Sequence, residues 1–119
     1  MIHLTLPLPP TINHYYGQSG KRKYIKAAGQ VFRLTVAEIV AGAGHATLEG
    51  RLGVFASIFP ANRIKQDLDN RQKALLDALT HAGVWLDDSQ IDALYLLRRE
   101  VIKGGKVEII IMELQEATL

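Results

Sequence analysis

The chain has 119 residues, no cysteine, and 14 Lys and Arg against 12 Asp and Glu, so its formal net charge is only +2. This length is enough for one domain that buries a core without cross-links, and we expect a single domain over residues 1–119. The lack of cysteine excludes disulfides and thiolate metal sites. No apolar run approaches the roughly 20 residues that cross a bilayer, so we expect a cytoplasmic protein without a membrane partner.

The first third of the chain predicts a strand, a loop and a helix. Apolar and polar residues alternate over residues 2–6, which predicts a strand that the following prolines end. Residues 8–26 are rich in Pro, Asn, Gly and Tyr and are predicted to form a loop, which at this length is usually functional. Apolar residues at helical spacing then predict an amphipathic helix over residues 27–43, ended by Gly42 and Gly44.

The middle of the chain predicts a buried strand and a second helix. Residues 52–58 are apolar at nearly every position, which indicates a strand covered on both faces and stopped by Pro60. A second helix is predicted over residues 70–82. Asp69 is its expected N-cap, and Gln72 would complete a capping box with it.

Two more strands are predicted over residues 91–102 and 107–114. The Gly104-Gly105 pair between them is typical of a two-residue hairpin, so we expect these strands to be antiparallel neighbours. The order of main elements is then β-α-β-α-β-β, without repeats. This order predicts an α+β fold, a single two-layer domain with a mixed β-sheet and two main helices.

Carboxylates lie on both sides of the second predicted helix, with Asp67 and Asp69 before it and Asp87 and Asp88 after it. Mg²⁺ and Mn²⁺ prefer such oxygen ligands, and a bound metal supplies the activated water and charge stabilisation that phosphodiester hydrolysis needs. In an extended segment Asp67 and Asp69 point the same way, and Leu68 between them would point to the core. The pattern predicts a divalent-metal site.

The helix itself separates the two acidic segments. Residues 70–82 form a helix about 20 Å long, and residues 83–88 span about 20 Å only when almost fully extended. Asp88 can therefore return to Asp67 and Asp69 if its segment is extended or the helix ends early. In the other arrangement, a partner subunit completes the site.

Basic residues gather in two places. Lys21, Arg22 and Lys23 cluster in a stretch flanked by glycine, and Arg63 and Lys65 stand just before the acidic pair. These cations could meet phosphates while the carboxylates hold metal. The alternative is that they are solvated loop charges.

Lys73 follows Asp69 by four residues and shares its helix face. It could neutralise a scissile phosphate or protonate a leaving oxygen. The alternative is an exposed ion pair with Asp69 or with Asp77.

The chain resembles the RusA family of Holliday junction resolvases. The resemblance rests on an ordered set of motifs: Asp67-Leu68-Asp69-Asn70, Lys73, Asp77-Ala78-Leu79, Gly83 and Trp85-Leu86-Asp87-Asp88. The Pro-rich start, Asn13 and Tyr15-Tyr16 fit the start of the family, so the resemblance covers nearly the whole chain.

The resemblance implies a homodimeric, Mg²⁺-dependent endonuclease, with Mn²⁺ as a substitute, that nicks two opposed strands of four-way junction DNA in recombination and repair. A two-fold dimer places two identical sites on a two-fold substrate. Carried over by position, Asp67, Asp69 and Asp88 are the metal-binding catalytic acids, Asp87 is an auxiliary ligand and Lys73 is the catalytic cation. Asn70 would orient a ligand. The candidate DNA contacts are Asn13, Tyr15, Lys21, Arg22, Lys23, Arg63 and Lys65.

The chain departs from the family before Asp67, where more arginines are usual than Arg63 and Lys65, with Gln66 following. Fewer phosphate contacts predict weaker junction binding that depends less steeply on salt.

Four other interpretations stay open. The chain could be a DNA-binding module without catalysis, or a nuclease acting more broadly on flaps and forks. Asp67-Leu68-Asp69 could be the metal-binding motif of a nucleotide-sugar transferase, although the chain is short for that fold and has no Gly-rich nucleotide turn. It could also be an interaction protein with an acidic surface turn.

Overall fold

Four apolar segments of the chain form one mixed sheet in a computed structural model, which describes residues 1–114. The strands are β1 (Ile2–Leu6), β4 (Leu52–Phe59), β5 (Ile91–Arg98) and β6 (Lys106–Glu113), in the spatial order β1-β6-β4-β5. β4 pairs with β5 in parallel and with β6 antiparallel, and β6 also pairs antiparallel with β1. The predicted mixed sheet is confirmed.

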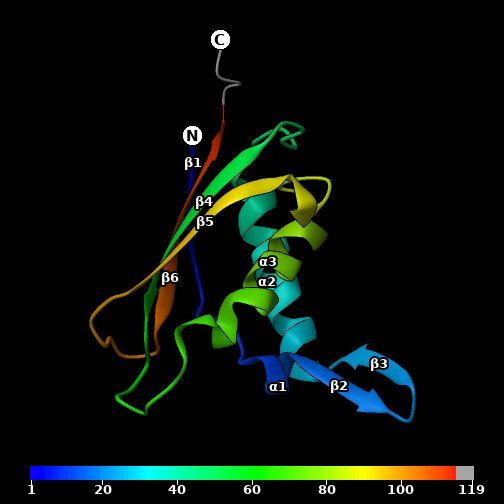
Figure 1. Cartoon of the computed structure of the whole chain (residues 1–119), viewed down its shortest axis with the longest axis vertical. Helices are drawn as coiled ribbons and strands as arrows, with labels where there is room; N and C mark the ends of the chain where they lie inside the picture. Colours follow the sequence, from blue (N-terminus) through cyan, green and yellow to red (C-terminus); the bar gives the residue numbers. More distant parts are fainter. Residues whose placement is uncertain (115–119) are drawn as a thin grey trace.

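Two helices, α2 (Ala27–Ala43) and α3 (Gln72–His81), pack side by side on one face of this sheet (Figure 1). Phe32 from α2 and Leu75 from α3 are buried with the inward side chains of the strands in one hydrophobic core. Gly44, with φ of 70°, ends α2 in the left-handed conformation that glycine adopts without strain. The predicted α+β fold with two main helices is confirmed, and so are the bounds of the first helix.

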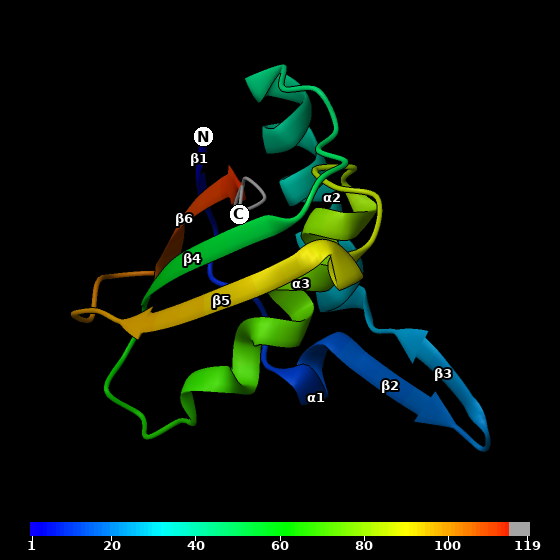
Figure 2. The ribbon, with the colours of Figure 1, turned by 45° about the horizontal axis from the view of Figure 1, so that its top comes forward.

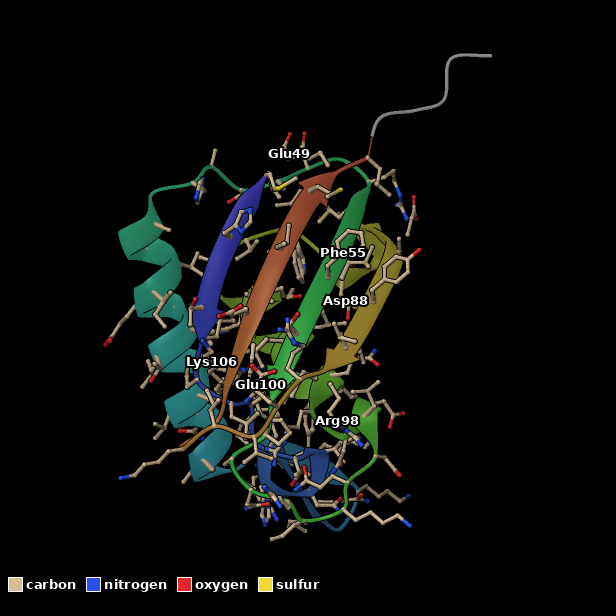
Figure 3. The ribbon with its side chains drawn as sticks, turned by 90° about the vertical axis from the view of Figure 1, so that its left-hand side faces the viewer. Glu49, Phe55, Asp88, Arg98, Glu100 and Lys106 are labelled. Atoms are coloured by element: carbon tan, nitrogen blue, oxygen red, sulfur yellow. The ribbon has the colours of Figure 1, made fainter. Side chains whose placement is uncertain are left out.

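No helix of the described residues covers the other face of the sheet, which faces the viewer in Figure 3. Phe55 from β4 and Tyr95 from β5 are partners in the strand register, and their rings stack on this face with centroids 4.8 Å apart. Tyr95 is 60% exposed and its neighbour Leu97 is 56% exposed. The period of two along β5 thus sends apolar side chains to both faces, which is why the burial of β5 is weaker than that of β4.

Residues 8–26 are more regular than the loop that we predicted. They contain a short helix, α1 (Ile12–Tyr15), and a hairpin of β2 (Tyr16–Ser19) and β3 (Arg22–Ile25) that extends away from the body of the protein (Figure 2). The hairpin strands are mostly polar, so hydrophobic alternation does not mark them. The signal that the sequence offered for this hairpin was the glycine in its turn, Gly20, which has φ of 62° in the structure.

The prediction that the last two strands are neighbours is wrong, because β4 lies between β5 and β6. β5 also ends at Arg98 and does not continue to residue 102. After β5, the amides of Arg99 and Ile102 donate hydrogen bonds to the carbonyls of Ile58 and Pro60, so the chain continues alongside the end of β4. β4 is buried along most of its length and takes a partner on each side, and this outweighs the local hairpin signal. In the part of the chain described here, no helix is long and apolar enough to span a membrane.

Candidate active site

The first acidic segment leads into a 3-10 turn, η1 (Leu68–Arg71), that precedes α3. Asp67 occupies the N-cap position of this turn in an extended conformation, and no side chain caps either η1 or α3. The predicted capping box of Asp69 and Gln72 is therefore wrong, because a 3-10 turn begins at Leu68 and the α-helix begins only at Gln72. Leu68 is 37% exposed, so the expectation that it points to the core is wrong as well.

The side chains of Asp67 and Asp69 are exposed, and neither forms an ion pair with another described residue. Within residues 1–114, the acidic partners of the ion pairs are Asp77, Asp92, Glu100 and Glu108. Carboxylates at the start of a helical segment benefit from its partial positive charge, yet here they have no cationic side-chain partner. Two free carboxylates in one short segment are a donor set suited to a hard divalent cation.

The second acidic segment forms a tight turn, η2 (Asp88–Gln90), capped by Asp87. The Asp87 carboxylate accepts a hydrogen bond from the Ser89 amide at 3.1 Å, and the Gln90 side chain accepts one from the Asp87 amide at 2.9 Å. These two bonds make a capping box. The capping box thus occurs at the second acidic segment, and it leaves the Asp88 side chain exposed.

Gln90 organises this turn, and our sequence reasoning missed it. Its side chain is the one buried polar side chain among the described residues, with 8% exposure. Its oxygen also accepts from the Leu86 amide, and its nitrogen donates to the carbonyls of Leu48 and Gly50 at 3.0 and 2.9 Å. The available signal was its spacing of three residues after Asp87, which is the spacing of a capping box.

Asp87 and Asp88 influence each other's ionisation. The hydrogen bond with Asp87 raises the pKa of Asp88, and partial burial and the negative charges of Asp87 and Asp77 add to this increase. Hydrogen bonds, first that of the Ser89 amide, hold the pKa of Asp87 below its usual value. The pair therefore titrates in two steps, in which Asp88 takes up a proton first as the pH falls.

Replacing Asp87 with asparagine should lower the pKa of Asp88 in the metal-free protein. Asparagine can still cap the turn, but it removes the negative charge that disfavours ionised Asp88. Carboxyl NMR titration of the metal-free variant would measure this, with Asp92→Asn as a control that also removes one carboxylate. An unchanged or higher pKa for Asp88 would contradict the expectation.

The chain order places α3 between the two acidic segments. Because β4 and β5 are parallel, the connection between them begins where β4 ends and returns to the opposite end of the sheet. α3 alone has 10 residues, a length of about 15 Å. Within residues 1–114, no three His, Cys, Asp or Glu side chains are grouped so that they could hold a metal ion. Asp67 and Asp69 lie two residues apart in one short segment, and no such group among the described residues joins Asp88 to them.

Lys73 lies in the first turn of α3 and is exposed. Its ammonium group is 5.0 Å from the centre of the Tyr16 ring. Lys73 also lines a pocket of about 450 Å³ between α3 and the hairpin, together with Asn13, Lys23 and Tyr24. The structure thus places Lys73 beside predicted DNA contacts of the hairpin.

The alternative ion pair of Lys73 with Asp77 is wrong. Asp77 is bound instead by Arg33, whose Nη2 donates to its carboxylate at 2.6 Å, and by the Tyr15 hydroxyl. Tyr15 is fully buried, and burial and the hydrogen bond to Asp77 raise its pKa. The burial of its ring in this structure argues against the predicted contact of Tyr15 with DNA.

The remaining predicted residues stay at the surface. Asn70 lies in η1, where its amide donates to the Asp67 carbonyl at 3.2 Å. Lys21, Arg22 and Lys23 are exposed on the hairpin. Arg63 and Lys65 line a groove beside Asp67. No described contact uses the charges of these five cations in an ion pair.

Comparison with known proteins gives one consistent result. Residues 7–112 match the family described as Endodeoxyribonuclease RusA. The chain is similar to "Crossover junction endodeoxyribonuclease rusA" of Enterobacteria phage 82, with 41% identity over 113 residues and 94% of each chain covered. It is also similar to the proteins of that name from Escherichia coli (strain K12) and Shigella sonnei (strain Ss046), each 40% identical over 115 residues with 93% of each chain covered.

Proposed function

The chain belongs to the RusA family of endodeoxyribonucleases, and on that premise we propose that it is a crossover junction endodeoxyribonuclease. Its substrate would be the four-way DNA junction, which it would resolve by paired symmetric nicks in recombination and repair, in the cytoplasm of a bacterial host. The observation that carries the proposal is the family match over residues 7–112, which spans both exposed acidic segments and Lys73.

We propose Mg²⁺ as the cofactor, with Mn²⁺ as a substitute. Bound metal would supply an activated water and stabilise charge on the leaving oxygen. Asp67 and Asp69 are free to hold it, and Mg²⁺ commonly takes one or two carboxylates with waters and substrate phosphate. Asp88, with Asp87 as an auxiliary ligand, would join them from a second copy of the chain or through a rearrangement of residues 83–88. Asn70 would orient a ligand.

We further propose that the enzyme is a homodimer. A four-way junction has two-fold symmetry, so a two-fold dimer would present one acidic site to each of two opposed strands. Paired nicking in one encounter requires both sites on the same complex. A monomer would leave junctions with a single nick.

The test is cleavage of a synthetic mobile four-way junction, with a linear duplex of the same arm sequence as control, in Mg²⁺ and in EDTA. Symmetric nicks in the junction alone, lost in EDTA, would support the proposal. Binding without nicking in Mg²⁺ would refute catalysis and leave a junction-binding module. Equal cutting of flaps and forks would refute junction specificity and favour the broader nuclease.

Lys73→Gln should reduce the rate of junction cleavage at saturating enzyme by about a hundredfold or more. The loss of a positioned cation at the reacting phosphate weakens stabilisation of the transition state more than it weakens binding. The measurement is single-turnover cleavage beside junction affinity.

Lys103→Gln is the matched control for Lys73→Gln, because it removes one exposed lysine from the turn between β5 and β6. A Lys73→Gln enzyme that binds several-fold more weakly but cleaves at the wild-type rate when saturated would assign Lys73 to binding alone.

A further inference from the structure

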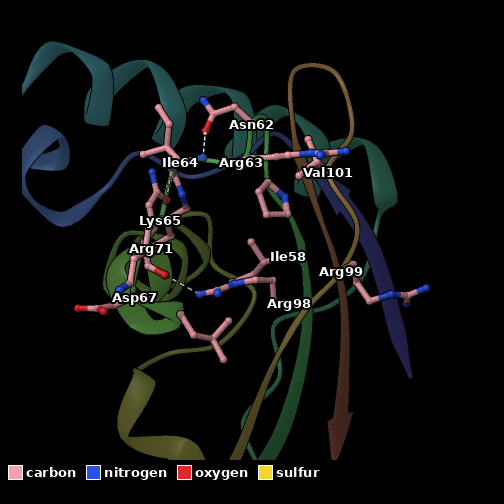
Figure 4. A pocket seen from close by; sticks show the side chains of 13 residues that line it. Ile58, Asn62, Arg63, Ile64, Lys65, Asp67, Arg71, Arg98, Arg99 and Val101 are labelled. Carbon is pink, nitrogen blue, oxygen red and sulfur yellow. Dashed lines mark hydrogen bonds between the residues drawn. The ribbon is translucent and has the colours of Figure 1, made fainter.

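A cationic groove of about 330 Å³ opens beside Asp67, between the segment after β4 and the ends of β5 and the following loop (Figure 4). Among residues 1–114, five Lys and Arg line it, whereas Asp67 is its only carboxylate. These five are Arg63, Lys65, Arg71, Arg98 and Arg99. Because the net charge of the whole chain is only +2, this is a strong local concentration of positive charge.

Arg98 forms one wall of the groove, and no sequence pattern pointed to it. It is the last residue of β5, and its guanidinium reaches across to the acidic segment, where Nη2 donates to the Gln66 carbonyl at 2.6 Å (Figure 4). A guanidinium has five N–H donors, so this bond fixes the side chain while other donors remain free. Arg98 is exposed and has no carboxylate partner among the described residues.

Two other arginines of the groove, Arg71 and Arg99, have different roles. Arg71 is partly buried, and its guanidinium donates to the Pro9 carbonyl and to the Gln66 side chain. Burial lowers the pKa of Arg71, and two of its donors are bound to the protein. The Arg99 guanidinium lies 5.2 Å from the centre of the Phe59 ring and pairs with Glu100. The cations free to meet a ligand are therefore Arg63, Lys65 and Arg98.

Apolar side chains stand among these cations. Ile64 is 69% exposed, Val101 is 42% exposed and Leu68 is 37% exposed, and all three line the groove. A ligand that satisfies this surface needs negative charge together with apolar groups at short spacing. The sugar-phosphate backbone of DNA has both, because deoxyribose carbons separate its phosphates.

We propose that this groove binds the DNA backbone next to the phosphate that is cut, with Arg63, Lys65 and Arg98 contacting successive phosphates. The inference rests on the proposed function and adds Arg98 to its substrate contacts. Asp67 lines the groove, so a strand lying in it passes one carboxylate of the acidic pair. Its contacts are to backbone, so they contribute to affinity on any sequence and position the strand without reading bases.

The test is equilibrium binding in EDTA of a fluorescent four-way junction, and of a linear duplex, over a range of salt concentrations. Arg98→Gln should weaken binding to both by about tenfold at low salt and reduce the slope of log K against log salt by about 0.9, as for one lost phosphate contact. Arg98→Lys should keep most of the slope, because it keeps the charge. Lys103→Gln, a loss of the same charge outside the groove, should leave the slope near that of the wild type.

Binding measurements keep this inference separate from the proposed function, because a protein that binds through the groove but never nicks would refute only the latter. An unchanged salt slope for Arg98→Gln would overturn the inference. If that variant loses stability through its bond to Gln66, the double variant Arg63→Gln, Lys65→Gln, which removes neither partner of that bond, should reduce the slope by about 1.8. A double variant with the wild-type slope would also overturn it.

Discussion

Replacing Asp67 with asparagine should reduce the rate of junction cleavage by about a thousandfold or more while junction binding persists. Asparagine keeps the size and the N-cap position of Asp67 at η1, but it is a neutral and much weaker ligand for Mg²⁺. Binding in EDTA should stay equal or tighten slightly, because one negative charge leaves the DNA-facing groove. The measurement is single-turnover cleavage of a labelled junction beside its affinity.

Glu38→Gln is the matched control for Asp67→Asn, because it converts an exposed carboxylate of α2 into an amide on a different element. It should cleave junctions at the wild-type rate. An Asp67→Asn protein that cleaves within a few-fold of wild type would show that the acidic pair is a surface feature and not a metal site. Loss of both binding and folding would be detected by circular dichroism before any kinetic conclusion.

Gln90→Ala should lower the free energy of unfolding by about 3 kcal/mol, because it leaves four partly buried backbone groups without this partner. The carbonyls of Leu48 and Gly50 lose a donor, and the amides of Leu86 and Asp87 lose an acceptor. Urea unfolding measures the change. Gln30→Ala on the exposed surface of α2 is the control and should change stability by less than about 1 kcal/mol.

Gln90→Glu distinguishes the hydrogen bonds that Gln90 accepts from those that it donates. A carboxylate still accepts from the Leu86 and Asp87 amides, but it can no longer donate to the Leu48 and Gly50 carbonyls. We expect the Gln90→Glu protein to keep the conformation of the acidic turn but to lose the hydrogen bonds between this turn and residues 48–50. If both variants are as stable as wild type, Gln90 is not the organising residue of the turn.

The sequence predicted the fold class and the main elements because the strands and both long helices have strong hydrophobic periods. It did not predict the position of β5, since a local turn signal says which segments are joined but not which strand lies between them. The nearly continuous burial of β4 decides that question, because a strand covered along its length takes a neighbour on each edge. The hairpin of β2 and β3 was missed because its strands bury little and therefore show no alternation.

Some residues of the candidate site were likewise predicted from the sequence, and others were missed. Asp67, Asp69, Asp88 and Lys73 were found from carboxylate spacing and family resemblance, and they remain proposals that the variants above test. Gln90 and Arg98 were missed because their roles depend on backbone carbonyls contributed by segments far away in sequence. The burial of Tyr15 was missed because a tyrosine in a polar stretch looks exposed until its hydrogen-bond partner Asp77 is known.

The bond between Tyr15 and Asp77 joins two parts of the surface that DNA would contact. Tyr15 immediately precedes β2, and the Lys26 amide, just after β3, donates to the Tyr15 carbonyl at 2.8 Å, so both ends of the hairpin are tied to this residue. Asp77 lies one turn beyond Lys73 on α3. The basic hairpin and Lys73 are therefore preorganised on one rigid frame. The conformational entropy of setting their spacing is lost when the chain folds, and binding does not have to lose it again.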